Sequence, residues 1–463
     1  MPGTPLRKNQ IVEMEVSGFG LDAEGVCRHG DAGMAVFVPG ALPGERIRAR
    51  IVKVEKRHAF ARLEGIDRAS ADRAEPPCPV YRRCGGCAAQ HMTYARTLEF
   101  KRIQVRDCLA RIGGDALAGL QVPAVLGMDE PWHYRNKGSF PVSGQPGAPR
   151  IGFYAPRSHE VIDAPMGCMI QHPTANGLVA AVRAWMEAHR VAPYDEAAHA
   201  GALRHIVVRT ARDGRAMVTL VSREPSLPAT EELLEALRGA APGLASVMLC
   251  HNPARTNVIF EGPVRALWGA DAIEDTLCGL RFRVSPHSFF QVNPAQTEAL
   301  YARALAFAAL TGSETVVDAY CGAGAISLLL ARGARRVIGI ESLSAAVADA
   351  RFNAERNGIE NAEFVPDVAE RALPELVAHG LAPQVVVVDP PRKGCDPALL
   401  AAIAQAAPRR VVYVSCNPAT LARDASYLCK AGFRAVAVQP VDMFCWAGGV
   451  EAVMLLESCC SMK

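Results

Sequence analysis

The C-terminal third of the chain has the most regular pattern of hydrophobic and polar positions. From about residue 285, short apolar runs alternate with longer amphipathic stretches. The apolar runs include TVVDAY, RRVIGIE, AEFVPD, QVVVVDPP and RRVVYVSC, and the stretches between them include AISLLLARG, LSAAVADARFNAERNG and PALLAAIAQAA. The runs predict strands and the stretches predict helices. Because such alternation is typical of a parallel sheet covered on both faces, we predict an α/β domain over residues 281–463.

The first part of the chain has a different pattern. Residues 8–65 consist of short β-rich runs separated by glycines and Pro-Gly turns, among them IVEMEVSGFG, MAVFVPG and ERIRARIVKVEKRHAFARLEGI. This pattern predicts a small β-barrel over residues 1–66. From Arg46 to Arg62 there are seven basic residues against two acids, Glu45 just before them and Glu55 among them. Such a patch suits a partner with a phosphate backbone, and a solvated strand face explains it equally well.

The middle of the chain is less regular. After the linker DRASADRAEPP comes a group of cysteines, and then TLEFKRIQVRDCLARIGG, which predicts a helix of about 93–114 ended by two glycines. We expect this helix to pack on the C-terminal domain. Residues 120–280 mix strand and helix patterns without one period. We therefore predict a mixed α+β domain over residues 75–280.

Composition excludes some classes of protein. A chain of 463 residues with 50% hydrophobic and 21% charged residues suits a globular protein of several domains. It lacks an apolar stretch of the length that crosses a membrane, and MPGTPLRKNQ lacks the apolar segment of a secretory signal, so we expect a cytoplasmic protein. In a reducing compartment its 15 cysteines suit metal ligands, catalytic groups or core positions better than disulfides.

The predicted sheet carries polar groups where its strands end. The turn Gly322–Gly324 joins a strand to a helix, and Glu341, Asp367 and Asp389 end or follow the next strands. Ligands of open α/β sheets bind outside the carboxyl ends of strands. Acids at these places also serve as helix N-caps. The short glycine motif disfavours a pyrophosphate cofactor and favours a nucleoside such as S-adenosylmethionine.

Two further residues at this edge predict a reaction. Cys416 ends the apolar strand of VVYVSCNPAT, and Glu451 opens the final strand. A thiolate that adds to carbon 6 of a pyrimidine makes carbon 5 nucleophilic toward a methyl donor, and a base then removes the carbon 5 proton. Cys416 suits the nucleophile, Glu451 the base, and Asp389 a hydrogen-bond partner of the uracil edge. The alternative is that Cys416 fills space in the core and that Glu451 is a surface carboxylate.

A third group of residues suits a metal. Cys78, Cys84 and Cys87 have the spacing C-x5-C-x2-C, and Cys168, in the turn APMGCMIQH, is a candidate for the fourth ligand. A set of four sulfur ligands suits zinc or an iron–sulfur cluster, and the spacing alone does not separate the two.

Several motifs together resemble the RNA uracil-5-methyltransferase family over nearly the whole chain. They are SCNPATLARD, DAYCGAGAISL, VVVVDPPRKG, SFFQVNPAQTEALY and HYRNKGSF, and VPGALPGERIRARIVK is similar to the family's OB-like TRAM barrel. The resemblance implies a Rossmann-like class I methyltransferase sheet, with Cys416 as nucleophile and Glu451 as base. It further implies that S-adenosylmethionine is bound by Gln291, Tyr320, Glu341, Asp367 and Asp389.

The resemblance also implies a cluster and a substrate. Members that act on ribosomal RNA carry a 4Fe–4S cluster with this cysteine spacing, and members that act on tRNA look to lack it. A uridine in a single-stranded loop of 23S ribosomal RNA is therefore the expected target, because a paired base must first be flipped out. The chain departs from the family at Ala325, often asparagine, and at Cys445–Gly449, where a proline–histidine stretch and a histidine two residues before the base are usual.

Other functions make different demands on the sequence. A tRNA uridine-5 methyltransferase needs the same nucleophile and base, and a non-catalytic TRAM-type RNA-binding protein needs neither. Radical methylthiotransferases have the spacing C-x3-C-x2-C, which this chain lacks. A cytosine-5 enzyme is expected to carry a cysteine beside the D-P-P prolines, where this chain has Arg392. An amino-group methyltransferase needs no thiol at Cys416.

Overall fold

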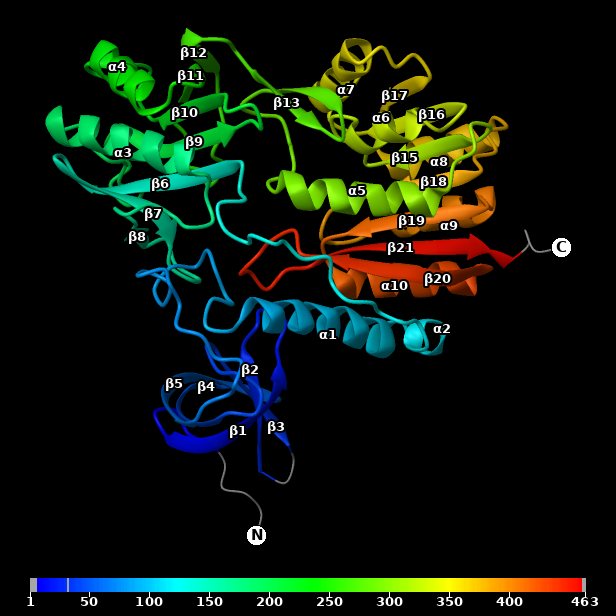
Figure 1. Cartoon of the computed structure of the whole chain (residues 1–463), viewed down its shortest axis with the longest axis horizontal. Helices are drawn as coiled ribbons and strands as arrows, with labels where there is room; N and C mark the ends of the chain where they lie inside the picture. Colours follow the sequence, from blue (N-terminus) through cyan, green and yellow to red (C-terminus); the bar gives the residue numbers. More distant parts are fainter. Residues whose placement is uncertain (1–5, 31–32, 460–463) are drawn as a thin grey trace.

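The computed structural model describes residues 6–30 and 33–459, which form a barrel and two large sheets (Figure 1). The barrel lies at one end of the molecule, and helix α1 (Tyr94–Ile112) lies between it and the C-terminal sheet. None of the helices in the described ranges is both long and apolar enough to cross a membrane.

The N-terminal strands close into a five-stranded barrel of order β1-β2-β3-β5-β4. Their bounds are β1 (Ile11–Phe19), β2 (Gly25–His29), β3 (Met34–Val38), β4 (Arg46–Val54) and β5 (His58–Arg68). Alternate residues of β4, namely Ile47, Ala49 and Ile51, point into the core, so the basic residues between them point outward. This is the predicted barrel.

The basic residues of the barrel have acidic partners on neighbouring strands. Ion pairs join Arg46 to Glu13, Arg48 to Asp67, Arg50 and Arg62 to Glu64, and Lys53 to Glu55. The count of nearby acids in the sequence missed most of these partners, because they come from β1 and β5. Much of the predicted basic patch is therefore an ion-paired strand face, which weakens the argument for a phosphate partner at this surface.

The middle of the chain forms a seven-stranded sheet of order β12-β11-β10-β9-β6-β7-β8. Its strands are β6 (Lys137–Gln145), β7 (Ala148–Tyr154), β8 (Val161–Asp163), β9 (Leu203–Thr210), β10 (Ala216–Ser222), β11 (Leu244–His251) and β12 (Val264–Gly269). Helices α3 (Pro173–Ala188) and α4 (Thr230–Ala240) cover one face through a common apolar core. The hairpin β13 (Ile273–Leu277) and β14 (Leu280–Val284) leads on to the C-terminal sheet.

The C-terminal sheet has the order β17-β16-β15-β18-β19-β21-β20. Its strands are β15 (Thr315–Ala319), β16 (Arg336–Glu341), β17 (Ala362–Pro366), β18 (Val385–Val388), β19 (Arg410–Ser415), β20 (Phe433–Val441) and β21 (Glu451–Ser458). The first five are parallel, but β21 is antiparallel to both β19 and β20. The expectation of a parallel sheet is thus correct for five strands and wrong for β21, because a strand's hydrophobic pattern does not encode its direction. Strand β20, antiparallel to β21, again runs in the same direction as the first five.

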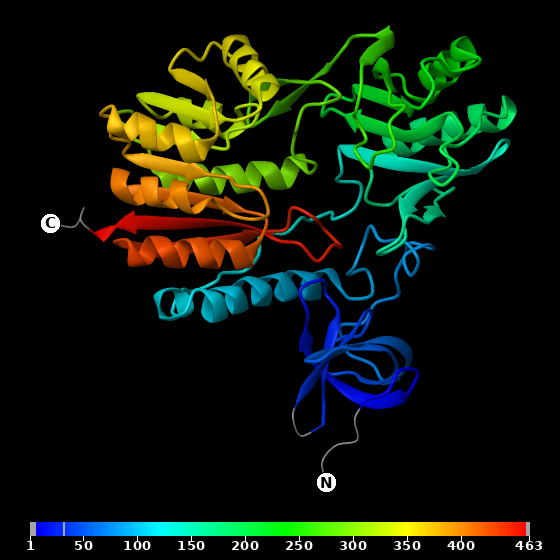
Figure 2. The ribbon, with the colours of Figure 1, turned by 180° about the vertical axis from the view of Figure 1, so that it is seen from behind.

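Helices cover both faces of this sheet. They are α5 (Pro294–Ala308), α6 (Ala325–Ala331), α7 (Ser344–Arg356), α8 (Ala369–Ala378), α9 (Pro397–Ala406) and α10 (Pro418–Lys430). Helix α1, capped by Thr93, packs along α10 (Figure 2) and is followed by the short α2 (Asp115–Ala118). The ring of Phe100 on α1 lies 4.8 Å from that of Phe19 in the barrel, so α1 joins the barrel to the sheet.

Candidate active site

The predicted nucleophile and base meet because β21 is antiparallel to β19. Ser415 at the end of β19 pairs with Ala452 of β21, so the next residues in this register are Cys416 and Glu451. An antiparallel strand begins where its parallel neighbours end. Glu451 therefore lies at the carboxyl edge of the sheet, where open α/β sheets bind ligands.

Burial and charge bias both groups toward their neutral forms. Glu451 is buried, and desolvation, reinforced by Asp389 and opposed by Arg392, raises its pKa to about 8. Burial also raises the pKa of the Cys416 thiol; Glu451 and Asp389 raise it further, and Arg392 lowers it. The Glu451 carboxylate thus lies close enough to raise the pKa of the Cys416 thiol, and Asp389 and Arg392 act on both groups.

Arg392 is a further cation at this edge, and its sequence motif did not predict a role for it in the reaction. It follows Pro390 and Pro391 after β18, and its backbone carbonyl accepts a hydrogen bond from Asn417 Nδ2 at 3.0 Å. Its side chain is exposed and lowers the pKa of both Cys416 and Glu451. A basic residue directly after the D-P-P turn was the available signal.

Asp389, which is partly buried, has two buried polar groups near it, Asp318 and Tyr301. Burial raises the pKa of Asp389 and of Asp318 to about 7 each. Asp318 accepts a 2.5 Å hydrogen bond from Ser327 Oγ, while its Oδ1 is buried without a partner in the described residues. Tyr301 is fully buried, and burial and the nearby Asp389, Asp318 and Glu451 raise its pKa well above the ordinary value. Tyr301 lies on α5 and received no role from its sequence pattern, although the motif SFFQVNPAQTEALY ends at this residue.

The glycine turn and Glu341 form one preorganised unit. The backbone N–H of Gly322 donates to Glu341 Oε2 at 3.2 Å, and the N–H of Leu343 donates to Oε1 at 2.8 Å. Gly324 has φ +82°, and a Cβ there would lie 3.2 Å from the Phe364 ring, so glycine is required. This arrangement suits a nucleoside whose ribose hydroxyls reach Glu341.

The side chains of the other predicted cofactor residues differ in whether they already have a hydrogen-bond or ion-pair partner. Tyr320, in the left-handed region with φ +66°, donates its hydroxyl to Glu370 at 2.8 Å. Asp367 is ion-paired with Arg371 of α8, which lowers its pKa, so its carboxylate already has a partner. The Gln291 side chain has no hydrogen-bond partner in the part of the chain that the structure describes, and only its carbonyl is used, by Asn136 Nδ2 at 3.1 Å.

The four predicted metal ligands line one cavity of about 300 Å³. They are Cys78, Cys84, Cys87 and Cys168. Burial raises the pKa of Cys87 to about 12 and that of Cys168 to about 11, so both thiols ionise at neutral pH only when a positive group replaces the proton. No three candidate ligands in the described ranges are close enough to hold a single metal ion. The four thiols nevertheless line the same cavity, and four sulfur ligands suit zinc or an iron–sulfur cluster.

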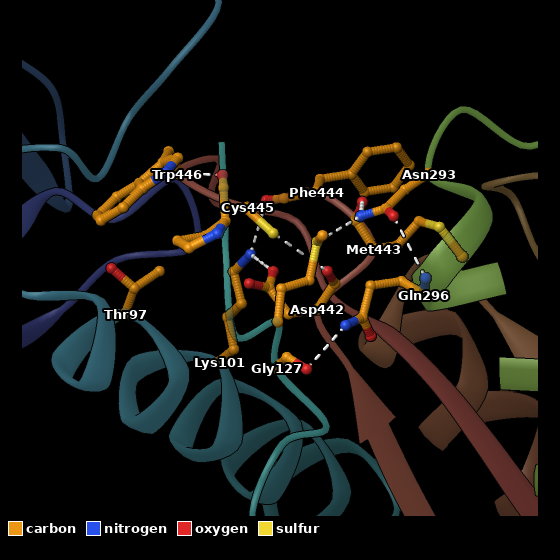
Figure 3. Close-up of polar contacts among 12 residues, drawn as sticks. Thr97, Lys101, Gly127, Asn293, Gln296, Asp442, Met443, Phe444, Cys445 and Trp446 are labelled. Carbon is orange, nitrogen blue, oxygen red and sulfur yellow. Dashed lines mark hydrogen bonds and ion pairs between the residues drawn. The ribbon is translucent and has the colours of Figure 1, made fainter. Parts of the chain in front are cut away.

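The loop that leads to Glu451 is held from below by α1 (Figure 3). Lys101 of α1 and Asp442 form a fully buried ion pair, and Lys101 Nζ also donates to the carbonyl of Phe444 at 2.8 Å. The hydroxyl of Tyr94 donates to the other oxygen of Asp442 at 2.7 Å. These contacts fix the first turn of the loop between β20 and β21.

The same loop touches the cysteine segment. The carbonyl of Trp446 accepts hydrogen bonds from the N–H groups of Ala88 and Ala89, directly after Cys87, at 2.8 and 3.0 Å. The Trp446 indole stacks on Trp132 at 4.6 Å and donates to the carbonyl of Pro131 at 3.0 Å. Trp446 thus occupies the stretch where the chain departs from the expected proline and histidine, and connects the cysteine segment to the strand of Glu451.

The chain matches known family models and known proteins along most of its length. Residues 272–459 match the family model described as tRNA (Uracil-5-)-methyltransferase, and residues 5–63 match the TRAM domain. An uncharacterized RNA methyltransferase of Halalkalibacterium halodurans is 46% identical, with 98% of each chain covered. One from Clostridium tetani is 44% identical, with 98% of this chain and 97% of the other covered.

A solved structure shows the same architecture with a cofactor product. It is the Pyrococcus abyssi tRNA (uracil-54, C5)-methyltransferase in complex with S-adenosyl-L-homocysteine, 26% identical, with a TM-score of 0.76 over 96% of this chain and 100% of that one. These matches confirm the predicted fold and the family that the motifs indicated. The chain belongs to the S-adenosylmethionine-dependent RNA uracil-5-methyltransferase family and carries a TRAM domain at its N-terminus.

Proposed function

We propose that this protein methylates carbon 5 of a uridine in 23S ribosomal RNA, with Cys416 as nucleophile and Glu451 as base. The observation that carries the proposal is the pairing of β19 with β21, which brings Cys416 and Glu451 to one edge of the sheet beside Asp389. In this scheme residues 1–66 and 75–280 bind the RNA and residues 281–463 carry the chemistry.

The reaction follows from these positions. The thiolate of Cys416 adds to carbon 6 of the uracil, and carbon 5 becomes nucleophilic. S-adenosylmethionine supplies an electrophilic methyl group, and its methyl–sulfur bond breaks as carbon 5 bonds the methyl. Glu451 takes the proton from carbon 5, the double bond between carbons 5 and 6 forms again, and the Cys416 thiolate leaves. The raised pKa of Glu451, about 8, makes its carboxylate a stronger base, and the ionised fraction that can accept the proton increases as the pH rises toward 8.

The residues that bind the cofactor are proposed from where they lie at the carboxyl edge of the C-terminal sheet. Glu341, tied to the glycine turn, is suited to the ribose hydroxyls, and Gln291 has a free amide. Tyr320 follows β15 directly before the turn, and Asp367 follows β17, which lies beyond β16 in the sheet. Asp389, whose pKa of about 7 allows it to donate or accept a hydrogen bond, is suited to the uracil edge as well as to the cofactor.

The ribosomal target and the 4Fe–4S cluster are proposed together. Four thiols around one cavity of about 300 Å³ support a cluster held by Cys78, Cys84, Cys87 and Cys168. Its role would be structural, because it holds the segment on which Trp446 rests. A cysteine quartet combined with a TRAM barrel favours ribosomal RNA, and a single-stranded loop gives the enzyme access to the base.

A tRNA uridine is the second candidate target. It is favoured by the likeness to the Pyrococcus abyssi enzyme, which acts on tRNA and is matched over its full length.

Nucleoside mass spectrometry separates these targets. Ribosomal RNA and tRNA from cells that lack the enzyme are incubated with the protein and methyl-labelled S-adenosylmethionine. The proposal predicts label in 5-methyluridine of 23S ribosomal RNA and none with Cys416→Ala. Label only in tRNA would retain the mechanism and replace the substrate. Label in 5-methylcytidine, or label made by Cys416→Ala, would refute the proposed chemistry.

A further inference from the structure

Two cations face each other across neighbouring strands of the central sheet. Lys137 at the start of β6 pairs directly with Arg209 of β9. Like charges placed directly opposite on an antiparallel pair destabilise the sheet. Arg209 is only 4% exposed and Lys137 is partly buried, so water screens the repulsion poorly. Desolvation, and then Arg209 and Arg135, lower the pKa of Lys137 to about 8.

The described part of the protein supplies no carboxylate to neutralise the positive charge of Lys137 and Arg209. Within residues 6–30 and 33–459, no carboxylate forms an ion pair with Arg135, Lys137 or Arg209, and Lys137 has no hydrogen-bond partner for its amine. Arg209 Nη2 donates to the carbonyls of Pro286 and Ser288, but its Nε is buried without a partner. Carbonyls satisfy donors without cancelling a charge, so the pair calls for a bound anion.

The pair lies beside the proposed reaction site. Asn136, next to Lys137, is bonded to the segment that carries the cofactor residue Gln291: its N–H donates to the Val292 carbonyl at 2.9 Å and its Nδ2 to the Gln291 carbonyl. Arg135, on the other side of Asn136, lines the cysteine cavity. Figure 1 shows β6 beginning on the side of the central sheet that faces the C-terminal sheet. An anion at this place would lie between the cofactor segment and the cysteine cavity.

We propose that Lys137 and Arg209 bind a backbone phosphate of the RNA near the target uridine. This inference rests on the proposed RNA methyltransferase function and names the part of the protein that holds the substrate backbone. A lysine supplies a mobile point charge and an arginine a fixed donor, which together suit a phosphate. The barrel cations Arg46, Arg48 and Arg50, by contrast, are paired with acids.

RNA binding as a function of salt tests the site. The probe is fluorescent oligouridylate, titrated with the protein over a series of KCl concentrations in the presence of S-adenosylhomocysteine. Loss of one phosphate contact in Lys137→Met should weaken binding roughly tenfold, equal to about 1.4 kcal/mol. It should also reduce the slope of log K against log[KCl] by about 0.7, the value for one phosphate of a single strand. Lys137→Arg should retain both.

Matched controls separate this site from general charge and from folding. Lys430→Met removes an exposed lysine at the C-terminal end of α10 and should leave both quantities unchanged. Calorimetry with S-adenosylhomocysteine should give the wild-type affinity for Lys137→Met. Lys137→Gln is measured beside it, and either variant that binds S-adenosylhomocysteine normally decides the question. Because the readout is RNA binding, it is independent of whether 5-methyluridine is formed.

An RNA phosphate, free inorganic phosphate and a group in the cysteine cavity would each give a different result in these measurements. If Lys137→Met binds oligouridylate with the wild-type affinity and salt slope, the proposal is overturned. It is equally overturned if only inorganic phosphate, at matched ionic strength, raises the Tm of the wild type more than that of Lys137→Met, because the site then takes a free anion. A changed metal content with unchanged RNA binding would assign the cations to the cysteine cavity instead.

Discussion

Cys416 and Glu451 lie beside the same charged neighbours, Asp389 and Arg392, which shift the pKa of both groups in the same directions. Burial favours the neutral form of both, and Arg392 is the neighbouring cation that acts against it. A thiol must ionise before it attacks, so the charge of Arg392 increases the fraction of thiolate near neutral pH.

Removal of that charge should move the pH profile. In Arg392→Met the pKa of Cys416 and that of Glu451 should both rise, because the cation stabilised their ionised forms. The thiolate fraction at neutral pH then falls, about tenfold for each pKa unit. We expect kcat/KM to rise with pH in both proteins and the variant's curve to be displaced toward higher pH. Lys393→Met, at the exposed neighbouring position, is the control. Superimposable curves would show that Arg392 does not act on the thiol.

Single residues differ in how well the sequence could predict them. Cys416, Glu451 and Glu341 could be found because each ends or begins a recognisable strand. Tyr301 could not, because on α5 it has the pattern of any core residue. Lys101 and Asp442 are 341 residues apart, and nothing local in either segment predicts the other.

Among secondary-structure elements, the antiparallel direction of β21 has the greatest consequence for function. The alternation of apolar runs predicted where the strands are, but an alternating or fully apolar run reads the same in either direction. If β21 were parallel to β19, Glu451 would lie at the opposite edge from Cys416. The partners of the barrel arginines were missed for a related reason, because strand register brings them together.

The buried pair between α1 and the loop before β21 should matter for both stability and rate. Lys101→Met leaves Asp442 as an unpaired buried charge, which costs about 3–5 kcal/mol of unfolding free energy. The double variant Lys101→Met/Asp442→Leu removes both charges and should recover much of that loss in urea unfolding. It still lacks the hydrogen bond from Lys101 Nζ to the Phe444 carbonyl, so kcat should stay low. Full recovery of kcat in the double variant would show that the pair has only a structural role.

The molecule as a whole is joined through α1 and the loop before β21. Helix α1 contacts the barrel through Phe100 and the C-terminal sheet through α10, and the loop rests on the cysteine segment through Trp446. The overall class of fold could be predicted from the sequence. The way in which the three parts contact each other could not, because those contacts join segments far apart in the chain.

The cysteine quartet should therefore affect the stability of the entire protein. Anaerobically purified wild type should contain iron and sulfide, and Cys168→Ser should lose both and unfold at a lower Tm. Cys429→Ser, which changes a thiol on α10 away from the cavity, should keep both. Zinc in place of iron would retain the site and replace the cluster. Wild type without metal, and with the Tm of Cys168→Ser, would contradict the proposed metal group.

The most direct test of the central claim is to isolate the covalent intermediate. Glu451→Gln cannot remove the carbon 5 proton, so the bond between Cys416 and carbon 6 should persist after methyl transfer. The variant is incubated with 23S ribosomal RNA and S-adenosylmethionine, digested with ribonuclease and protease, and analysed by mass spectrometry. The account predicts a methylated uridine nucleotide on the peptide that contains Cys416. A nucleotide on another cysteine, or no covalent nucleotide on a variant that binds both substrates, would contradict it.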